Sequence, residues 1–92
     1  MSDVTTPGST DPLTLYTTTW CPFCVRLKKL LDEKGIGYVE IDVESDAEAA
    51  AFVESVNDGN RVVPTALYSD GTTATNPSAS EVRRKLEALA GA

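Results

Sequence analysis

The stretch LTLYTTTWCPFC, residues 13–24, decides the fold. Its first half, residues 13–18, alternates leucines with polar or β-prone residues, which predicts a strand. Its second half places Cys21 and Cys24 three positions apart, where the strand pattern gives way to a helical one. Two thiols at a strand-to-helix junction, followed by a second strand, indicate redox chemistry more strongly than their bare spacing does.

The pattern on either side of this stretch predicts an alternating chain. Four β-prone runs bounded by turn residues predict strands over 13–18, 38–43, 61–69 and 72–76. Apolar residues at helical spacing predict three helices, from Pro22 to Gly35, from Ser45 to Asn57, and from Asn76 or Ser78 to the end. Ser45 with Glu48 has the spacing of a capping box. The expected order is β-α-β-α-β-β-α, an α/β domain over residues 13–92.

Length and composition exclude several classes of function. Ninety-two residues suffice for one small domain. A net charge of −6 makes nucleic acid an unfavourable partner, and no run of apolar residues is long enough to span a membrane. Residues 1–12 are polar and rich in turn formers, which predicts a disordered N-terminal tail without features of a signal peptide. A cytoplasmic location, where thiols stay reduced, is therefore expected.

The chain contains no histidine, and this narrows the chemistry further. Pairs of cysteine or serine with histidine are excluded as nucleophiles, and so are histidine metal ligands. A zinc site needs about four ligands, which two cysteines alone do not supply, so no metal is expected. Redox chemistry is the favoured interpretation of the two thiols; a metal site or inert thiols are the alternatives.

The two cysteines are predicted to differ in role. At helical spacing their α-carbons lie within the range that a disulfide needs. Cys21 precedes Pro22, which suits the first helical position, so its sulfur faces the unpaired N–H groups at the positive end of the helix. That position favours the thiolate and makes Cys21 the expected nucleophile. Cys24, one turn further and more shielded, is the expected resolving cysteine.

Other residues are candidates for binding a substrate. Pro64 interrupts a β-prone run, so it is either an ordinary trans proline at the start of a strand or a cis proline that turns the backbone of Val63 toward an extended substrate. Small polar groups precede the last helix, where they either bind a polar ligand or only form a turn and cap. The candidates there are Thr75, Asn76 and Ser78.

The remaining candidates flank the thiols or follow a loop. Trp20, Pro22 and Phe23 form an apolar lip beside the cysteines unless the aromatic rings belong to the core. Arg61 either reaches a ligand or is a solvated loop arginine. Between Glu40 and Asp58 every charged residue is acidic, and this run is interpreted as the solvated face of the second strand and second helix.

The combination of LTLYTTTWCPFC, the element order and VVPT resembles the thioredoxin superfamily, and within it the glutaredoxin branch. WCPFC, VNDGNRVVPT and DGTTATNPSASEV taken together resemble the actinobacterial glutaredoxin-like proteins called mycoredoxins. The resemblance implies a four-stranded mixed sheet flanked by three helices, an attacking Cys21, a second cysteine at Cys24 and a cis Pro64. Thioredoxin itself fits less well, because its usual glycine-proline pair differs from Pro22-Phe23.

The resemblance also implies a thiol partner. Glutaredoxins that use glutathione usually carry Gly-Gly and a following Asp near the start of the last helix, where this chain has ATNPSAS. Mycothiol has many hydroxyls and no free carboxylate, so the neutral side chains of Thr75, Asn76 and Ser78 are a reasonable substitute. The expected enzyme is a thiol-disulfide oxidoreductase that removes mycothiol from proteins, with mycothiol as co-substrate, no bound cofactor, and electrons from NADPH through a separate mycothiol disulfide reductase.

Three alternatives remain open. The nearest is a redoxin that takes electrons from thioredoxin reductase and delivers them to ribonucleotide reductase. The second is an iron–sulfur module in which two protomers each contribute Cys21, and the third is an interaction domain with inert thiols. One exposed reactive thiol and a net charge of −6 favour a monomer that meets many protein partners briefly.

Overall fold

Seven elements follow one another in the predicted order. They are β1 (Leu13–Thr17), α1 (Pro22–Glu33), β2 (Val39–Asp42), α2 (Ala47–Val56), β3 (Thr65–Tyr68), β4 (Thr73–Thr75) and α3 (Ala79–Ala90). The structure, a computed structural model, describes residues 13–90, so the predicted tail, residues 1–12, lies outside the described residues. The third strand begins after Pro64 rather than at residue 61, because proline has no N–H for a ladder.

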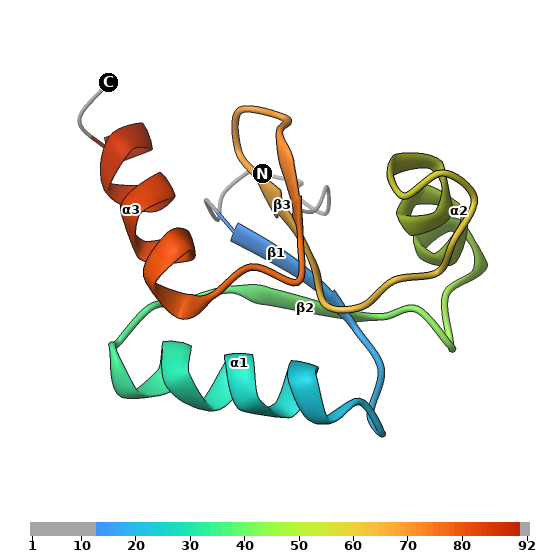
Figure 1. The fold of residues 1–92 in the computed structure, drawn as a ribbon, viewed down its shortest axis with the longest axis horizontal. Coiled ribbons are helices and arrows are strands. Elements are labelled where there is room, and N and C mark those ends of the chain that lie inside the picture. The colour runs from blue at the N-terminus through green and yellow to red at the C-terminus, as the bar shows by residue number, and fades with distance from the viewer. Residues whose placement is uncertain (1–12, 91–92) are drawn as a thin grey trace, which may run out of the picture.

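The four strands form one mixed sheet in the order β2-β1-β3-β4. β1 pairs in parallel with β2 and antiparallel with β3, and β3 pairs antiparallel with β4. β1 is central and buried at every position. Its carboxyl end therefore leads into α1 from the middle of the sheet (Figure 1). The predicted four-stranded mixed sheet with three helices is confirmed.

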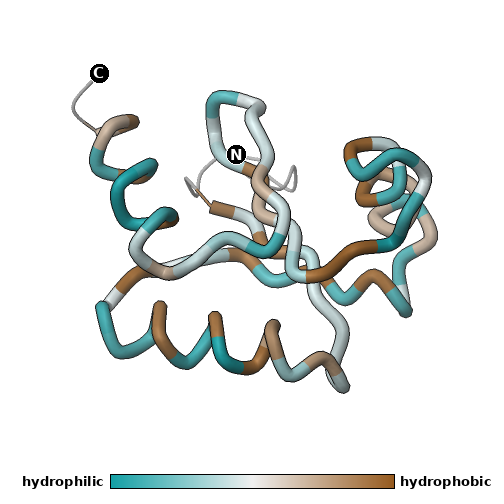
Figure 2. The backbone as a smooth tube through the Cα atoms, viewed as in Figure 1, coloured by the Kyte–Doolittle hydropathy of each residue, from teal (hydrophilic) through white to brown (hydrophobic). Residues whose placement is uncertain are grey.

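Helices cover both faces of the sheet and bury two apolar clusters. α1 and α3 lie over one face, where Leu27, Leu31 and Val82 pack against Leu13 and Leu15 of β1. Figure 2 shows the apolar residues of α1 on its sheet-facing side. α2 lies over the other face, where its buried residues Ala49, Ala50 and Val53 pack with Tyr16 and Val43.

β2 is an edge strand, and both of its faces are covered in part. Ile41 packs against the cluster under α2, as the alternation predicted, whereas Tyr38 packs against the cluster under α1 and α3. Glu40 is exposed, in agreement with the interpretation of the acidic run as a solvated face, yet it is not without partners. Its carboxylate accepts hydrogen bonds from Thr17 of β1 and from Lys28 of α1.

Local signals fix the ends of α1 and α3. Gly35 has φ +71°, a left-handed conformation that suits glycine, and the N–H of Ile36 donates to the carbonyl of Leu31 over 2.9 Å. At the start of α3, Ser78 and Glu81 form a reciprocal capping box: each side chain accepts from the backbone N–H of the other. Of the two predicted caps of this helix, Ser78 is therefore the one used.

The predicted capping box at the start of α2 is wrong by one residue. Asp46 is the N-cap, and its carboxylate accepts from the N–H of Ala49 over 3.0 Å. Ser45 belongs instead to the preceding turn, because its hydroxyl donates to the carbonyl of Asp42 over 3.3 Å. An ionised Asp interacts more favourably than Ser with the positive end of a helix, which is consistent with this choice.

Candidate active site

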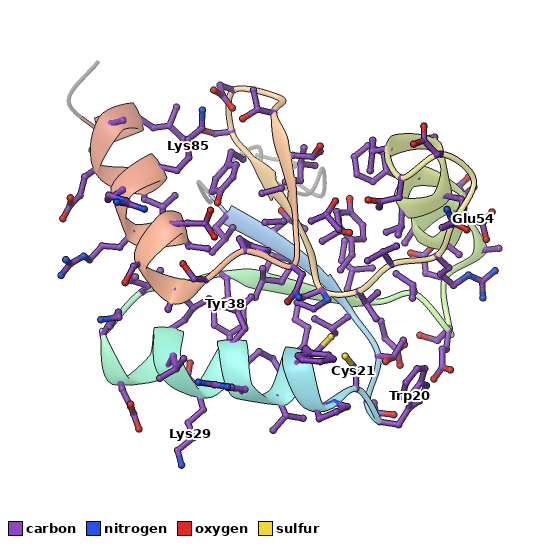
Figure 3. The ribbon with its side chains drawn as sticks, in the orientation of Figure 1. Trp20, Cys21, Lys29, Tyr38, Glu54 and Lys85 are labelled. Atoms are coloured by element: carbon purple, nitrogen blue, oxygen red, sulfur yellow. The ribbon has the colours of Figure 1, made fainter. Side chains whose placement is uncertain are left out.

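Cys21 is the N-cap of α1. Its Sγ accepts a hydrogen bond from the backbone N–H of Cys24 at 3.3 Å, and Pro22 occupies the first helical turn. The sulfur thus takes the place that a serine or aspartate oxygen takes at ordinary helix N-termini, where a negative charge is favoured. The thiol also lies 3.8 Å from the carbonyl oxygen of Val63. Figure 3 shows the two sulfurs beside each other at this end of α1.

Both cysteines are free thiols, and both are buried. Cys24 is 0% exposed, and burial raises its pKa to about 12. That value includes the hydrogen bond with Cys21, which also raises the pKa of Cys24, and the N–H of Thr18 and the charge of Lys28, which lower it. Cys21 is only 3% exposed, so the expectation of an exposed nucleophile is wrong. The cap holds its sulfur toward the helix, and Val63 covers it from the other side.

Trp20 and Phe23 are exposed beside these thiols. Their exposed fractions are 67% and 60%, so neither ring belongs to the core. The indole N–H of Trp20 donates to a carboxylate oxygen of Glu44 over 2.7 Å, which ties the segment before Cys21 to the segment after β2. Glu44 belongs to the acidic run, and no local pattern pairs it with Trp20 because the two residues lie 24 positions apart.

The segment before β3 meets the segment before α3 next to Cys21. The Val63–Pro64 peptide bond is cis, as the resemblance implied, and Pro64 is buried. The N–H of Asn76 donates to the carbonyl of Pro64 over 2.7 Å. Asn76 has φ +48°, a left-handed conformation that asparagine tolerates better than most residues. Two of the predicted site segments are thereby held against each other.

A cavity of about 300 Å³ opens between α1 and the start of α3. The residues that line it are Phe23, Arg26, Leu27, Leu30, Asn76, Pro77, Ser78, Ala79 and Glu81. Phe23, which lies between the two cysteines in sequence, is the lining residue nearest to them along the chain, and neither cysteine itself lines the cavity. Its walls combine apolar helix side chains with a few polar groups, the composition that ligand sites commonly have.

Two predicted site residues are directed elsewhere. The hydroxyl of Thr75 donates to the side-chain oxygen of Asn57, just after α2, and Thr75 does not line the cavity. Arg61 forms an ion pair with Glu54 of α2 at 3.1 Å, and its side chain is 52% exposed. The partners, Asn57 and Glu54, lie in or just after α2. The local sequence around Arg61 and Thr75 does not predict these two contacts.

Three polar residues on the other side of the thiols were missed. Lys28 Nζ and Thr17 Oγ1 both donate to Glu40 Oε2, over 2.6 and 2.7 Å. The sequence could have indicated Lys28, because it follows Cys24 by four residues and so lies on the same face of the helix. The position of Glu40 depended on which face of β2 the helices cover, and the alternation alone did not settle that.

Residues 13–72 match the family model described as Glutaredoxin. The chain belongs to the glutaredoxin family. Glutaredoxins are thiol-disulfide oxidoreductases, and a CxxC pair at a helix N-terminus provides the thiols for that chemistry. None of the helices in residues 13–90 is long and apolar enough to cross a membrane.

Relatives and solved structures agree with this assignment. The chain is 60% identical over 78 residues to Mycoredoxin 1 of Corynebacterium glutamicum, covering 85% of this chain and 96% of that protein. The solution structure of the glutaredoxin from Brucella melitensis is 30% identical, with a TM-score of 0.65 and coverage of 91% and 92%. The crystal structure of the Methanosarcina mazei glutaredoxin shares the fold, with a TM-score of 0.68 at 23% identity and coverage of 83% and 78%.

Proposed function

We propose that this glutaredoxin reduces mycothiol mixed disulfides on proteins through the Cys21 thiolate. The observation that carries the proposal is the cavity that begins at Phe23 and is walled on its far side by Asn76 and Ser78. Beside the charged Arg26 and Glu81, which also line the cavity, these neutral side chains offer hydrogen bonds to a thiol whose bulk is hydroxylated sugar. The 60% identity to Mycoredoxin 1 supports the same thiol.

The proposed reaction has two exchanges at one sulfur. The Cys21 thiolate attacks the mycothiol sulfur of the mixed disulfide, so that a Cys21–mycothiol disulfide forms and the protein leaves as a thiolate that takes up a proton. A second mycothiol thiolate then attacks the mycothiol sulfur on Cys21. This step releases mycothiol disulfide and restores the Cys21 thiolate, and Cys24 takes no part in it.

The partners follow from these steps. Mycothiol is a co-substrate rather than a bound cofactor, and a separate mycothiol disulfide reductase returns it to the thiol with electrons from NADPH. Trp20 and Phe23 contact the mycothiolated protein, and the backbone of Val63 pairs with it beside the sulfur. We propose that the protein works as a monomer in the cytoplasm, where such a pool stays reduced.

The test couples the reaction to NADPH. A mycothiol-capped protein, mycothiol and its reductase are mixed with the wild type, Cys24→Ser or Cys21→Ser, and NADPH consumption is followed. We expect Cys24→Ser to retain activity and Cys21→Ser to lose it. If none of the three proteins is active here, but the wild type turns over with thioredoxin reductase, the proposal fails in favour of a redoxin that supplies ribonucleotide reductase.

A second comparison tests where mycothiol binds. Asn76→Gly removes the amide but keeps a residue that adopts φ +48° without strain. We expect the KM for the mycothiol mixed disulfide to rise by about threefold to tenfold with kcat little changed, since roughly one hydrogen bond to a neutral group is lost. Thr75→Val is the matched control, because Thr75 is bonded to Asn57. An equal effect of both variants would place the ligand elsewhere.

A further inference from the structure

A set of three polar side chains beside the redox centre has no part in the reaction proposed above. Glu40 of β2 accepts from Lys28 of α1 over 2.6 Å and from Thr17 at the end of β1 over 2.7 Å. The side chains of Lys28 and Glu40 are 25% and 38% exposed, so solvent screens this pair less than a fully exposed one. The three residues join α1 to the central and edge strands.

Lys28 is placed to act on Cys24. It lies four residues beyond Cys24 on α1, so the two side chains leave the same side of the helix one turn apart. Few groups in residues 13–90 influence the Cys24 thiol: the sulfur of Cys21, the backbone N–H of Thr18 and the ammonium of Lys28. Lys28 is the only cation among them, and its charge lowers the pKa of Cys24.

Glu40 opposes this influence of Lys28. Burial alone would raise the pKa of Glu40, but the hydrogen bonds from Lys28 and Thr17 outweigh burial and hold that pKa below its ordinary value. The carboxylate is therefore ionised at neutral pH and bound to the ammonium of Lys28. A bound carboxylate offsets part of the positive potential that the ammonium would otherwise exert on Cys24.

We propose that Lys28 and Glu40 are positioning residues that act on Cys24 in opposite directions and so set how much turnover passes through a Cys21–Cys24 disulfide. In that route Cys21 first holds the substrate thiol in a mixed disulfide. Cys24 gives its proton to water and attacks Cys21 Sγ; the Cys21–Cys24 bond forms, the bond from Cys21 to the substrate sulfur breaks, and the substrate leaves as a thiolate that takes up a proton. The proposal rests on the oxidoreductase chemistry of the family and not on which thiol is the substrate.

The test measures closure of the internal disulfide without mycothiol. Reduced protein is mixed at pH 7.5 with bis(2-hydroxyethyl) disulfide, quenched with acid at intervals, and analysed by mass spectrometry. The masses of the Cys21 mixed disulfide and of the internal disulfide give separate rates for attack by Cys21 and closure by Cys24. Failure of the mycothiol proposal would leave this assay unaffected, so the two proposals are tested independently.

Opposite shifts are the expected result. Glu40→Gln, which keeps an oxygen for Thr17, should speed closure by about threefold, and Lys28→Met should slow it by about threefold, the size expected for one partly screened charge. Lys28→Arg keeps the charge and should close at close to the wild-type rate. Lys29→Met and Glu87→Gln remove the same charges at exposed positions and should change nothing; Figure 3 shows Lys29 directed away from the molecule.

A purely structural role would give a different result. Loosening of α1 would shift closure in the same direction in Glu40→Gln and Lys28→Met, and either that result or the absence of a shift would overturn the proposal. In every variant the rate of attack by Cys21 should change less than the rate of closure by Cys24, because the charge of Lys28 acts on Cys24. If Lys28→Met does not fold, as judged by thermal unfolding, the pair Glu40→Gln and Glu87→Gln decides.

Discussion

Cys21 and Cys24 lie one helical turn apart, yet their positions on α1 give the two thiols different environments. Cys21 precedes the helix, and its sulfur accepts a hydrogen bond from the N–H of Cys24, which has no carbonyl partner within the helix. Cys24 lies within the helix on its buried face, where burial raises its pKa to about 12. Exposure alone does not separate them, since the residues are 3% and 0% exposed. The difference between a nucleophile and a reserve thiol therefore comes from the deep burial of Cys24 within the helix and from the N–H that Cys21 accepts at the helix N-terminus.

The largest expected consequence of this contrast is selective alkylation. At pH 7 iodoacetamide should modify Cys21 at least about 100-fold faster than Cys24, because a thiol with a pKa near 12 has about one part in 10⁵ as thiolate at that pH. Peptide mass mapping after timed quenching measures both rates. In Cys21→Ser, Cys24 should stay unmodified until guanidinium unfolds the chain. Comparable alkylation rates at Cys21 and Cys24 in the folded wild type would show that the two thiols do not differ in reactivity.

Closure of the internal disulfide should depend steeply on pH. A raised pKa means that Cys24 is protonated at neutral pH, so each added unit of pH should increase its thiolate, and the closure rate, by about tenfold until the pKa is approached. The rate is measured between pH 6 and 9 with the mass assay described above. A profile that levels off near pH 8 would show that the mixed disulfide on Cys21 relieves most of the burial of Cys24.

Removing apolar cover near Cys24 should cost stability. Leu27 is 4% exposed, on the buried face of α1 one turn beyond Cys24, and Leu27→Ala should lower the free energy of unfolding by about 2 to 5 kcal/mol. Val25 is 52% exposed on the same helix, and Val25→Ala should cost less than about 0.5 kcal/mol. Urea unfolding of both variants measures the difference. Similar losses would mean that the buried face of α1 is no better packed than its exposed face.

The smallest expected effect concerns Cys21 as a helix cap. Serine offers an oxygen in place of the sulfur and alanine offers no acceptor, so Cys21→Ser should be more stable than Cys21→Ala by about 0.5 to 1 kcal/mol, although neither can react. Ser78→Ala gives the reference loss at the start of α3. Equal stability of the two Cys21 variants would show that the hydrogen bond from Cys24 contributes little to folding.

Local chemistry made most of the fold predictable. The alternation in β1, the apolar spacing of α1, Pro22 at its start and Gly35 at its end each act within a few residues, and the structure has all of them where the sequence places them. The shielding of Cys24 followed from the same helical spacing. Within the site, the predicted contact of Cys21 with the helix N-terminus needed only the neighbouring Pro22.

Apart from the cap of α2, the contacts that the sequence did not predict join residues distant in sequence. Cys21 was expected to be exposed, but Val63, 42 residues away, covers it. Glu40 is exposed as predicted, but the pattern of a strand does not show that its carboxylate pairs with Lys28 and Thr17. Thr75 and Arg61 were candidates for ligand contacts, and each is bonded to a residue in or just after α2; Arg61 is also 52% exposed, as its solvated alternative predicted. Such pairings depend on how the sheet and helices assemble, which no local pattern encodes.

The indole of Trp20 gives the molecule an optical property of its own. The chain contains one tryptophan, and it adjoins Cys21 with its N–H held by the Glu44 carboxylate. Fluorescence excited at the red edge of protein absorption therefore comes from the lip of the redox centre alone, free of background from the rest of the chain. The protein carries a built-in reporter through which oxidation, substrate docking and release can be timed in a stopped-flow instrument without a label.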